Sequence, residues 1–130
     1  MSDRFFDVSA YPYAHRGLWG GARPENSIAA FEAARTAGVG VELDVRLTAD
    51  GVPVVFHDAG LERMCGHREL LARVASDELA GHQLPDGSPI PTLAQALQPD
   101  YAQGALAARA LLDAPTPDLA RALLALCERA

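Results

Sequence analysis

Hydrophobic positions recur at every second residue in two stretches of the N-terminal half. Over residues 8–15 this alternation places Tyr11, Tyr13 and His15 on one side, which predicts a strand that ends at His15. Residues 39–47 alternate in the same way and predict a second strand.

The segment between these two strands has the period of a helix. Either Asn26 or Ser27 can accept the N-cap hydrogen bond, and Gly38 can end the helix in the left-handed conformation. Strand, helix and strand in this order predict a βαβ unit with parallel strands and a right-handed crossover. The apolar stripe of the helix consists of Ile28, Phe31 and Ala34.

A turn signal follows the second strand. Residues 48–51 read Thr-Ala-Asp-Gly, and residues 52–57 form a third extended run. Because a parallel crossover needs about a dozen residues or more, we expect 39–47 and 52–57 to form an antiparallel hairpin. The hairpin would then lie beside the parallel sheet and would not extend it by another βα unit.

Residues 61–87 have no sustained period. Short helical turns are expected around Glu69–Arg73 and Asp77–Ala80, and residues 92–95 (Thr-Leu-Ala-Gln) form a capping box for a helix through Leu97.

The composition changes after residue 97. Residues 98–130 contain no valine and no isoleucine, which argues against a strand. We expect two helices there, over 101–112 and 117–129.

The bulk composition limits the partners and the location. The 130 residues fit one domain, and a formal net charge of −6 argues against general attraction to nucleic acid or to an anionic membrane. Cys65 and Cys127 lack metal-type spacing and are typical of idle thiols in a reducing compartment. No run approaches the ~20 apolar residues of a membrane span, and residues 1–6 do not resemble a signal peptide. We therefore expect a cytoplasmic protein.

Two carboxylates are the first candidates for chemistry. On a strand, Glu42 and Asp44 point to the same face, while the residues on either side of them face an apolar layer. Paired oxygen ligands suit Mg²⁺ or Ca²⁺. The alternative is a pair of solvent-exposed acids on an edge strand.

Two histidines end the strand-like runs on either side of this pair. His15 and His57 could supply the general acid and base of phosphodiester cleavage, or they could be structural residues. Arg16 could hold phosphate oxygens or form an ordinary ion pair. Asp58 could orient a neighbouring group or cap the next turn.

Other polar and aromatic residues near these motifs have several interpretations. Trp19 could wall a pocket for an apolar or choline-like head group, or pack on the core. Glu25 and Asn26 are expected to serve the helix start, with contact to substrate or to a histidine as the alternative. His67 and His82 are expected at the surface.

Together these motifs resemble the glycerophosphodiester phosphodiesterase family. The resemblance covers residues from about 10 to 97 in the family's order and spacing. The matching motifs are Ala14-His-Arg-Gly17, Pro24-Glu-Asn-Ser27, Ala30-Phe31, Glu42-Leu-Asp-Val45, Thr48-Ala-Asp-Gly51, Val54-Val-Phe-His-Asp58, Leu61-Glu-Arg63 and Ile90-Pro-Thr-Leu93.

The resemblance implies an α/β fold that is part of a TIM-type (β/α) barrel. Residues 1–97 would supply the first two barrel strands and a β-hairpin insertion around 48–90, and residues 98–130 a divergent helical tail. The site would lie at the C-terminal ends of the strands.

The resemblance also implies roles for the site residues. His15 and His57 would be general acid and base, and Arg16 would hold the phosphate. Glu42 and Asp44 would bind Mg²⁺ or Ca²⁺. The reaction would hydrolyse a glycerophosphodiester to glycerol 3-phosphate and an alcohol.

The chain departs from the family pattern after residue 97. The family continues with a third barrel strand that carries another metal-binding glutamate and a nearby lysine, whereas this chain has no lysine. One alternative is therefore an inactive truncated or degenerate fragment. Another is a non-enzymatic protein that associates through unpaired strand edges or tail helices. A phospholipase D acting on lysophospholipids is a third.

Overall fold

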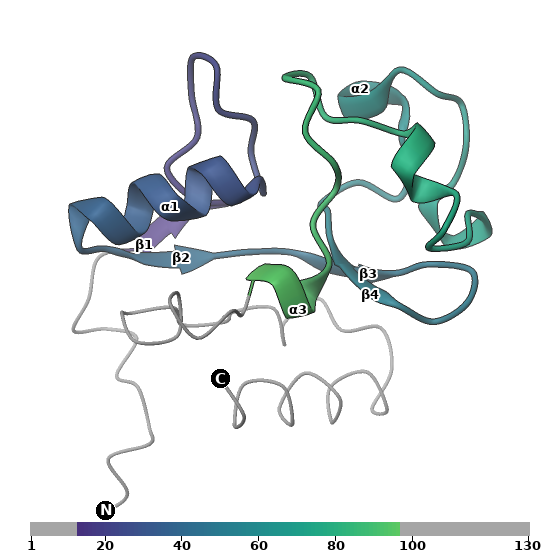
Figure 1. Ribbon diagram of the computed structural model, residues 1–130, viewed down its shortest axis with the longest axis horizontal. Helices are drawn as coiled ribbons and strands as arrows, with labels where there is room; N and C mark the ends of the chain where they lie inside the picture. The colour runs from purple at the N-terminus through teal and green to yellow at the C-terminus, as the bar shows by residue number, and fades with distance from the viewer. Residues whose placement is uncertain (1–12, 97–130) are drawn as a thin grey trace, which may run out of the picture.

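A computed structural model describes residues 13–96 (Figure 1). The predicted tail helices, the start of the first strand and Leu97 lie outside these residues. The helices and strands are β1 (Tyr13–His15), α1 (Ile28–Ala37), β2 (Gly40–Glu42), β3 (Val45–Leu47), β4 (Pro53–Val55), α2 (Glu62–Cys65) and α3 (Leu93–Ala96), with 3₁₀ turns η1 (Leu71–Arg73) and η2 (Leu79–Gly81).

The β1, α1 and β2 elements form the predicted βαβ unit. The strands β1 and β2 pair in parallel, with His15 opposite Glu42. The Ser27 side chain accepts a hydrogen bond from the Ala30 amide, and Gly38 ends α1 in the left-handed conformation with φ of 74°. The helix lies along the two strands (Figure 1), and its predicted apolar stripe packs on them.

The predicted strand over 39–47 is divided into two strands, so its expected extent was wrong. Its first part, β2, pairs with β1, whereas its second part, β3, pairs antiparallel with β4. Leu43 and Asp44 lie between the two parts, where the chain changes its pairing partner. The antiparallel hairpin of β3 and β4 is as predicted, with Val45 opposite Val55.

The two faces of β4 belong to two separate apolar clusters. Val55 packs with α1, β2 and α3, while Val54 packs in the second cluster, within the insertion between β4 and α3. The capping box of α3 is present: Gln95 Oε1 accepts from the Thr92 amide, and Thr92 Oγ1 accepts from the Gln95 amide. The chain therefore returns from the insertion to the βαβ unit through a well-defined helix start.

The insertion contains the two histidines and the cysteine that were not predicted to belong to the site. His67 is exposed as predicted, but His82 is buried at 8% exposure, so its predicted surface position was wrong. Leu79 and Leu84 are both buried in the second cluster. His82 lies between them in the sequence and is buried because they are. Cys65 is an unpaired, partly buried thiol, and burial raises its pKa.

One glycine allows α1 to approach the end of β1. Gly17 has φ of 82°, and a Cβ there would lie 2.8 Å from the Ala30 Cβ. We expect Gly17→Ala to lower the free energy of unfolding by about 1–2 kcal/mol for the left-handed backbone and by a further 1–3 kcal/mol or so for the overpacking. Denaturant unfolding measures this loss.

Gly38→Ala is the matched control for Gly17→Ala. Gly38 is also left-handed, but a Cβ there would meet no atom within 4 Å among the described residues. It should lose only the backbone contribution. Equal losses in the two variants would contradict the close approach of α1 to Gly17.

Candidate functional site

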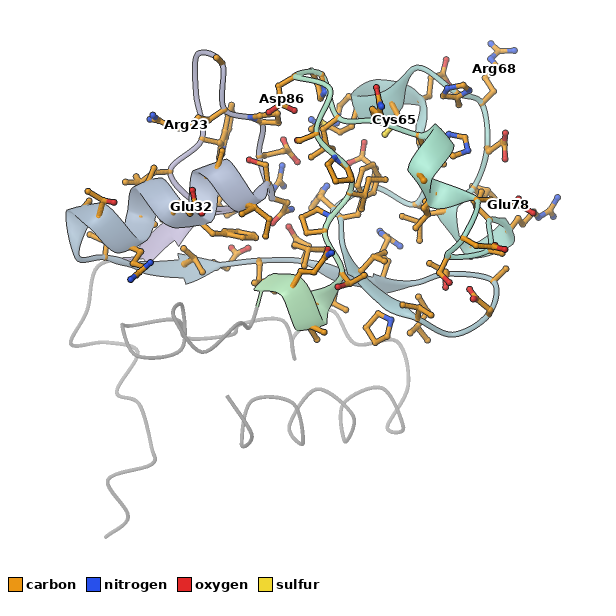
Figure 2. All side chains as sticks on the ribbon, in the orientation of Figure 1. Arg23, Glu32, Cys65, Arg68, Glu78 and Asp86 are labelled. Carbon is orange, nitrogen blue, oxygen red and sulfur yellow. The ribbon has the colours of Figure 1, made fainter. Side chains whose placement is uncertain are left out.

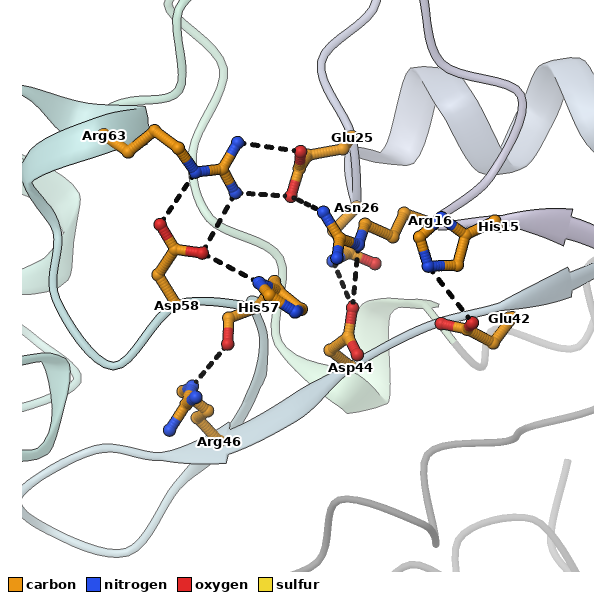
Figure 3. A network of polar contacts seen from close by, with 10 residues as sticks. All are labelled: His15, Arg16, Glu25, Asn26, Glu42, Asp44, Arg46, His57, Asp58 and Arg63. Atoms are coloured by element: carbon orange, nitrogen blue, oxygen red, sulfur yellow. Dashed lines mark hydrogen bonds and ion pairs between the residues drawn. The ribbon is translucent and has the colours of Figure 1, made fainter.

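The predicted site residues come together at one edge of the βαβ unit. His15 is the last residue of β1 and Glu42 the last of β2, so their side chains start from the same end of a parallel pair. Asp44 follows β2, and His57 follows β4 two residues after Val55. Figure 3 shows His15 with Glu42 on one side of Asp44 and His57 on the other.

Two residues with left-handed backbones shape this edge. Arg16 and Asn26 have φ of 60° and 55°, which is uncommon for residues other than glycine. The Arg16 amide donates to the Glu42 carbonyl at 2.7 Å, and the Asn26 amide donates to the Arg16 carbonyl at 2.8 Å. These bonds connect the start of α1 to the ends of both strands and hold Arg16 beside the carboxylates.

The two carboxylates face the site and the apolar residues around them face the core. Asp44 is buried at 7% exposure, and the Glu42 side chain is 25% exposed, which does not fit a pair of solvent-exposed acids. The buried residues on the opposite face are Val41, Leu43 and Val45.

One oxygen of each carboxylate has a protein partner. His15 Nε2 lies 3.4 Å from Glu42 Oε2. Asn26 Nδ2 donates to Asp44 Oδ2 at 3.1 Å, and Arg16 Nε lies 3.5 Å from the same oxygen. The second oxygen of each carboxylate makes no hydrogen bond within residues 13–96, and Asn26 Oδ1 is buried there without a partner. This leaves oxygen atoms available beside the histidines.

A chain of ion pairs joins Arg16 to His57 through Glu25, Arg63 and Asp58 (Figure 3). Glu25 Oε2 accepts from Arg16 Nη1 at 3.1 Å and from Arg63 Nη2 at 2.8 Å. Arg63 Nε donates to Asp58 Oδ2 at 2.8 Å, and Asp58 Oδ1 lies 2.8 Å from His57 Nδ1. We refer to these five residues as the ion-pair chain. It links the βαβ unit to the insertion.

The ion-pair chain shifts the protonation of its acids toward the charged forms. Hydrogen bonds from Arg63 lower the pKa of Glu25 against the opposing effect of burial, and Arg16 lowers it further. Arg63, together with His57, lowers the pKa of Asp58 to about 2, and both acids raise the pKa of Arg63. Glu25 and Asp58 are therefore carboxylates at neutral pH.

Sequence reasoning missed two arginines of the site. Arg63 was recognised only as part of a motif, because its partner Glu25 is 38 positions away. Arg46 Nε donates to the His57 carbonyl at 2.7 Å, and Arg46 lines a pocket of about 170 Å³ with Asp44 and His57. The same alternation that pairs Glu42 with Asp44 includes position 46 and could have indicated Arg46.

Trp19 lies beside the ion-pair chain and is not packed on the core. Its side chain is 51% exposed and lines a pocket of about 460 Å³ that also includes Glu25 and Arg63. The loop of residues 19–24 forms one wall, and Asp86 lies on the loop that faces it (Figure 2). The pocket therefore adjoins the site at Glu25.

Comparison with known proteins identifies the family. A sequence model of the glycerophosphoryl diester phosphodiesterase family matches residues 15–114, so the chain belongs to this family. Glycerophosphodiester phosphodiesterase 1 of Bos taurus is 38% identical over 65% of this chain and 28% of that protein. Glycerophosphodiester phosphodiesterase of Bacillus altitudinis is 44% identical over 52% of this chain and 27% of that protein. The chain thus spans less than a third of these relatives.

Solved structures confirm the predicted fold class, a partial (β/α) barrel. A glycerophosphodiester phosphodiesterase from Parabacteroides distasonis has a TM-score of 0.70 and 32% identity, over 90% of this chain and 50% of that chain. A phosphodiesterase from Oleispira antarctica in complex with the product sn-glycerol-3-phosphate has a TM-score of 0.63 and 35% identity, over 77% of this chain and 44% of that chain. Within the described residues the strands form two two-stranded sheets and no closed barrel.

One further prediction concerns membranes. No helix within residues 13–96 is long and apolar enough to cross a membrane. The cytoplasmic location, the division at residue 97 and the association through strand edges stay predictions.

Proposed function

We propose that this chain carries the N-terminal half of a phosphodiesterase site that hydrolyses glycerophosphodiesters to glycerol 3-phosphate and an alcohol. The observation that carries this proposal is the placement of His15 and His57 on either side of Asp44, with Arg16 in the same cluster (Figure 3). Membership of the family and the product named for the Oleispira antarctica structure support the substrate class.

Two histidines suit the two proton transfers of this reaction. One takes the proton from the attacking hydroxyl, that of water or of the substrate's own glycerol; in the second case the product of this step is a cyclic phosphate, which water opens to glycerol 3-phosphate in a second step. The other gives a proton to the leaving alcohol oxygen as the P–O bond breaks. His15 and His57 are 63% and 43% exposed, respectively, and can therefore reach a bound substrate.

The donor set fits a hard divalent cation. Glu42 and Asp44 each keep one oxygen without a protein hydrogen bond in the described part of the chain, and the Asn26 Oδ1 next to them is buried without a partner. Mg²⁺ usually binds through one or two carboxylates, with water and substrate phosphate completing its shell, so two carboxylates suffice to hold it. When bound, Mg²⁺ or Ca²⁺ would neutralise phosphate charge. Among residues 13–96, no three or more His, Cys, Asp or Glu side chains lie close enough together to hold a metal ion.

Arg16 and Trp19 would contact the substrate. The Arg16 guanidinium lies at the carboxylates and donates to Glu25, so only part of it is available to a phosphate. Trp19 would contact the alcohol part, because its pocket adjoins the ion-pair chain at Glu25 and Arg63.

A specific observation favours a second candidate function, that of an inactive or partner-completed fragment. The chain covers half or less of the two solved structures described above, and a third metal-binding side chain is not part of the described site. In such a fragment a third ligand would have to come from outside residues 13–96.

Turnover of glycerophosphocholine with Mg²⁺ or Ca²⁺ tests the proposed function. We expect alcohol release by the purified 130-residue chain above that of a His15→Ala variant, and no release after chelation of the cation. Activity that rises with the square of protein concentration would indicate completion by a second copy. Release equal to that of His15→Ala at every concentration would refute the enzyme and leave the fragment.

A further inference from the structure

The last contact of the ion-pair chain joins Asp58 to Nδ1 of His57, so the chain can determine which ring nitrogen of His57 carries the proton. We infer that Glu25 is a positioning residue that, through Arg63 and Asp58, keeps the proton of neutral His57 on Nδ1 and leaves Nε2 unprotonated. This inference rests on the proposed function, in which His57 exchanges a proton with the substrate.

The contact between Asp58 and His57 determines which nitrogen carries the proton. Asp58 Oδ1 lies 2.8 Å from His57 Nδ1, and the pKa of Asp58 is lowered to about 2, so this oxygen is ionised at neutral pH. An ionised carboxylate only accepts hydrogen bonds, so Nδ1 must donate. In the neutral ring the lone pair is then on Nε2, which is the form that a general base requires.

Arg63 fixes the Asp58 carboxylate. Its Nε and Nη2 donate to the two oxygens of Asp58 at 2.8 and 3.0 Å, which is a bidentate contact. Its Nη1 and Nη2 donate to the two oxygens of Glu25 at 3.0 and 2.8 Å. Because the guanidinium is planar and rigid, the Glu25 contact sets the plane in which Arg63 meets Asp58.

Glu25 is the fixed end of this arrangement. The Arg63 side chain is 48% exposed, whereas the Glu25 side chain is only 6% exposed. Glu25 is next to Asn26, whose amide bonds to Arg16. Without Glu25, the long Arg63 side chain would keep a single partner and gain freedom to leave Asp58.

Glu25 also reaches the other histidine-bearing segment. Its Oε2 accepts from Arg16 Nη1 at 3.1 Å, and Arg16 follows His15. A substitution of Glu25 therefore affects both Arg16 and His57, whereas a substitution of Arg63 leaves the Arg16 contact in place. Comparing the Glu25 and Arg63 variants therefore separates the effect on His57 from the effect on Arg16.

Long-range ¹⁵N–¹H spectra of the imidazole rings test the inference on the full chain. They are recorded on the alkaline side of the titration, at a pH above which the ring signals no longer change, so that the rings are neutral. The His57 signals are assigned with His57→Gln. We expect a protonated Nδ1 and a bare Nε2 at His57 in the wild type, and a mixture of tautomers in both Glu25→Gln and Arg63→Gln.

Kinetics provide a second readout of the same variants. We expect kcat to fall by about 10–100-fold in Glu25→Gln and in Arg63→Gln, the usual effect of removing an outer hydrogen-bonding partner. For Arg63→Gln the KM should change less than for Glu25→Gln, because Arg16 keeps its contact with Glu25. Glu78→Gln is the matched control, since Glu78 is exposed (Figure 2) and makes no side-chain hydrogen bond or ion pair within the described residues.

The tautomer separates this inference from the proposed function. It is read without turnover, so a chain with no phosphodiesterase activity still passes or fails. A proton on Nε2 in the wild type, or an unchanged tautomer in Glu25→Gln, would overturn the inference even if activity falls. If Glu25→Gln does not fold, Arg63→Gln and Asp58→Asn decide, because both residues lie at the more exposed end of the ion-pair chain. An unchanged tautomer in both would overturn it.

Discussion

Replacing His57 with alanine is expected to lower glycerophosphodiester turnover by about 10²–10⁴-fold, the usual contribution of a general acid or base. With its Nδ1 donating to the Asp58 carboxylate, His57 keeps Nε2 free to take a proton, so we assign it as the base; its loss then slows the attack on phosphorus whatever the leaving alcohol. The measurement is kcat for two substrates, glycerophosphocholine and a glycerophosphate ester of nitrophenol. We expect the same fold-loss for both.

Comparison with His15→Ala tests which histidine is the general acid and which is the general base. His15 lies on the other side of Asp44 from His57, with its Nε2 3.4 Å from Glu42 Oε2, and with His57 as the base it is left as the general acid. Nitrophenol leaves without being protonated, so His15→Ala should lose far less with the nitrophenyl ester than with glycerophosphocholine. The reverse pattern, with His57→Ala sparing the nitrophenyl ester, would exchange the two roles and contradict the assignment.

Local features of the fold were predictable because their causes are local. The capping box at Thr92 and Gln95 needs only four residues in sequence, and both of its hydrogen bonds are present. The hairpin followed from the shortness of the turn at residues 48–51, which excludes a parallel crossover.

The division of the strand over 39–47 could not be predicted from its alternation. The five apolar residues from Val39 to Leu47 all pack in one apolar cluster, and Glu42, Asp44 and Arg46 alternate with them at the site, so the pattern is continuous. The division arises because β1 occupies the edge of β2 while β4 occupies that of β3. That choice of partner is tertiary and leaves no mark on the periodicity.

Some residues of the site could also be predicted from local sequence, and others could not. His15 and His57 could be picked out because each ends a predicted strand, and Glu42 and Asp44 because they lie two residues apart on one face of a predicted strand. Glu25 was assigned to the helix start because its neighbours are cap residues. Its contact with Arg63 spans 38 positions and depends on the insertion folding back over residues 24–26, so no spacing rule reports it.

Replacing Asp44 with asparagine is expected to weaken Mg²⁺ or Ca²⁺ binding by more than about 100-fold, the upper end of the effect of losing an outer partner. Asp44 is the more buried of the two carboxylates, and Asn26 Nδ2 and Arg16 Nε hold one of its oxygens, so the other is fixed toward the cation. Titration calorimetry with each cation measures the loss, and turnover should fall with it.

Two further variants decide how the Asp44→Asn result is read. Asp77→Asn is the matched control, since Asp77 is exposed in the insertion and should leave cation binding unchanged. Glu42→Gln covers the case in which Asp44→Asn unfolds the protein by leaving Arg16 beside a neutral amide, because the Glu42 side chain is 25% exposed and its loss is better tolerated. Wild-type affinity in folded Asp44→Asn and Glu42→Gln would show that the cation does not bind between these carboxylates. The proton chemistry of His15 and His57 would then have to proceed with Arg16 and Arg46 as the cations nearest the phosphate.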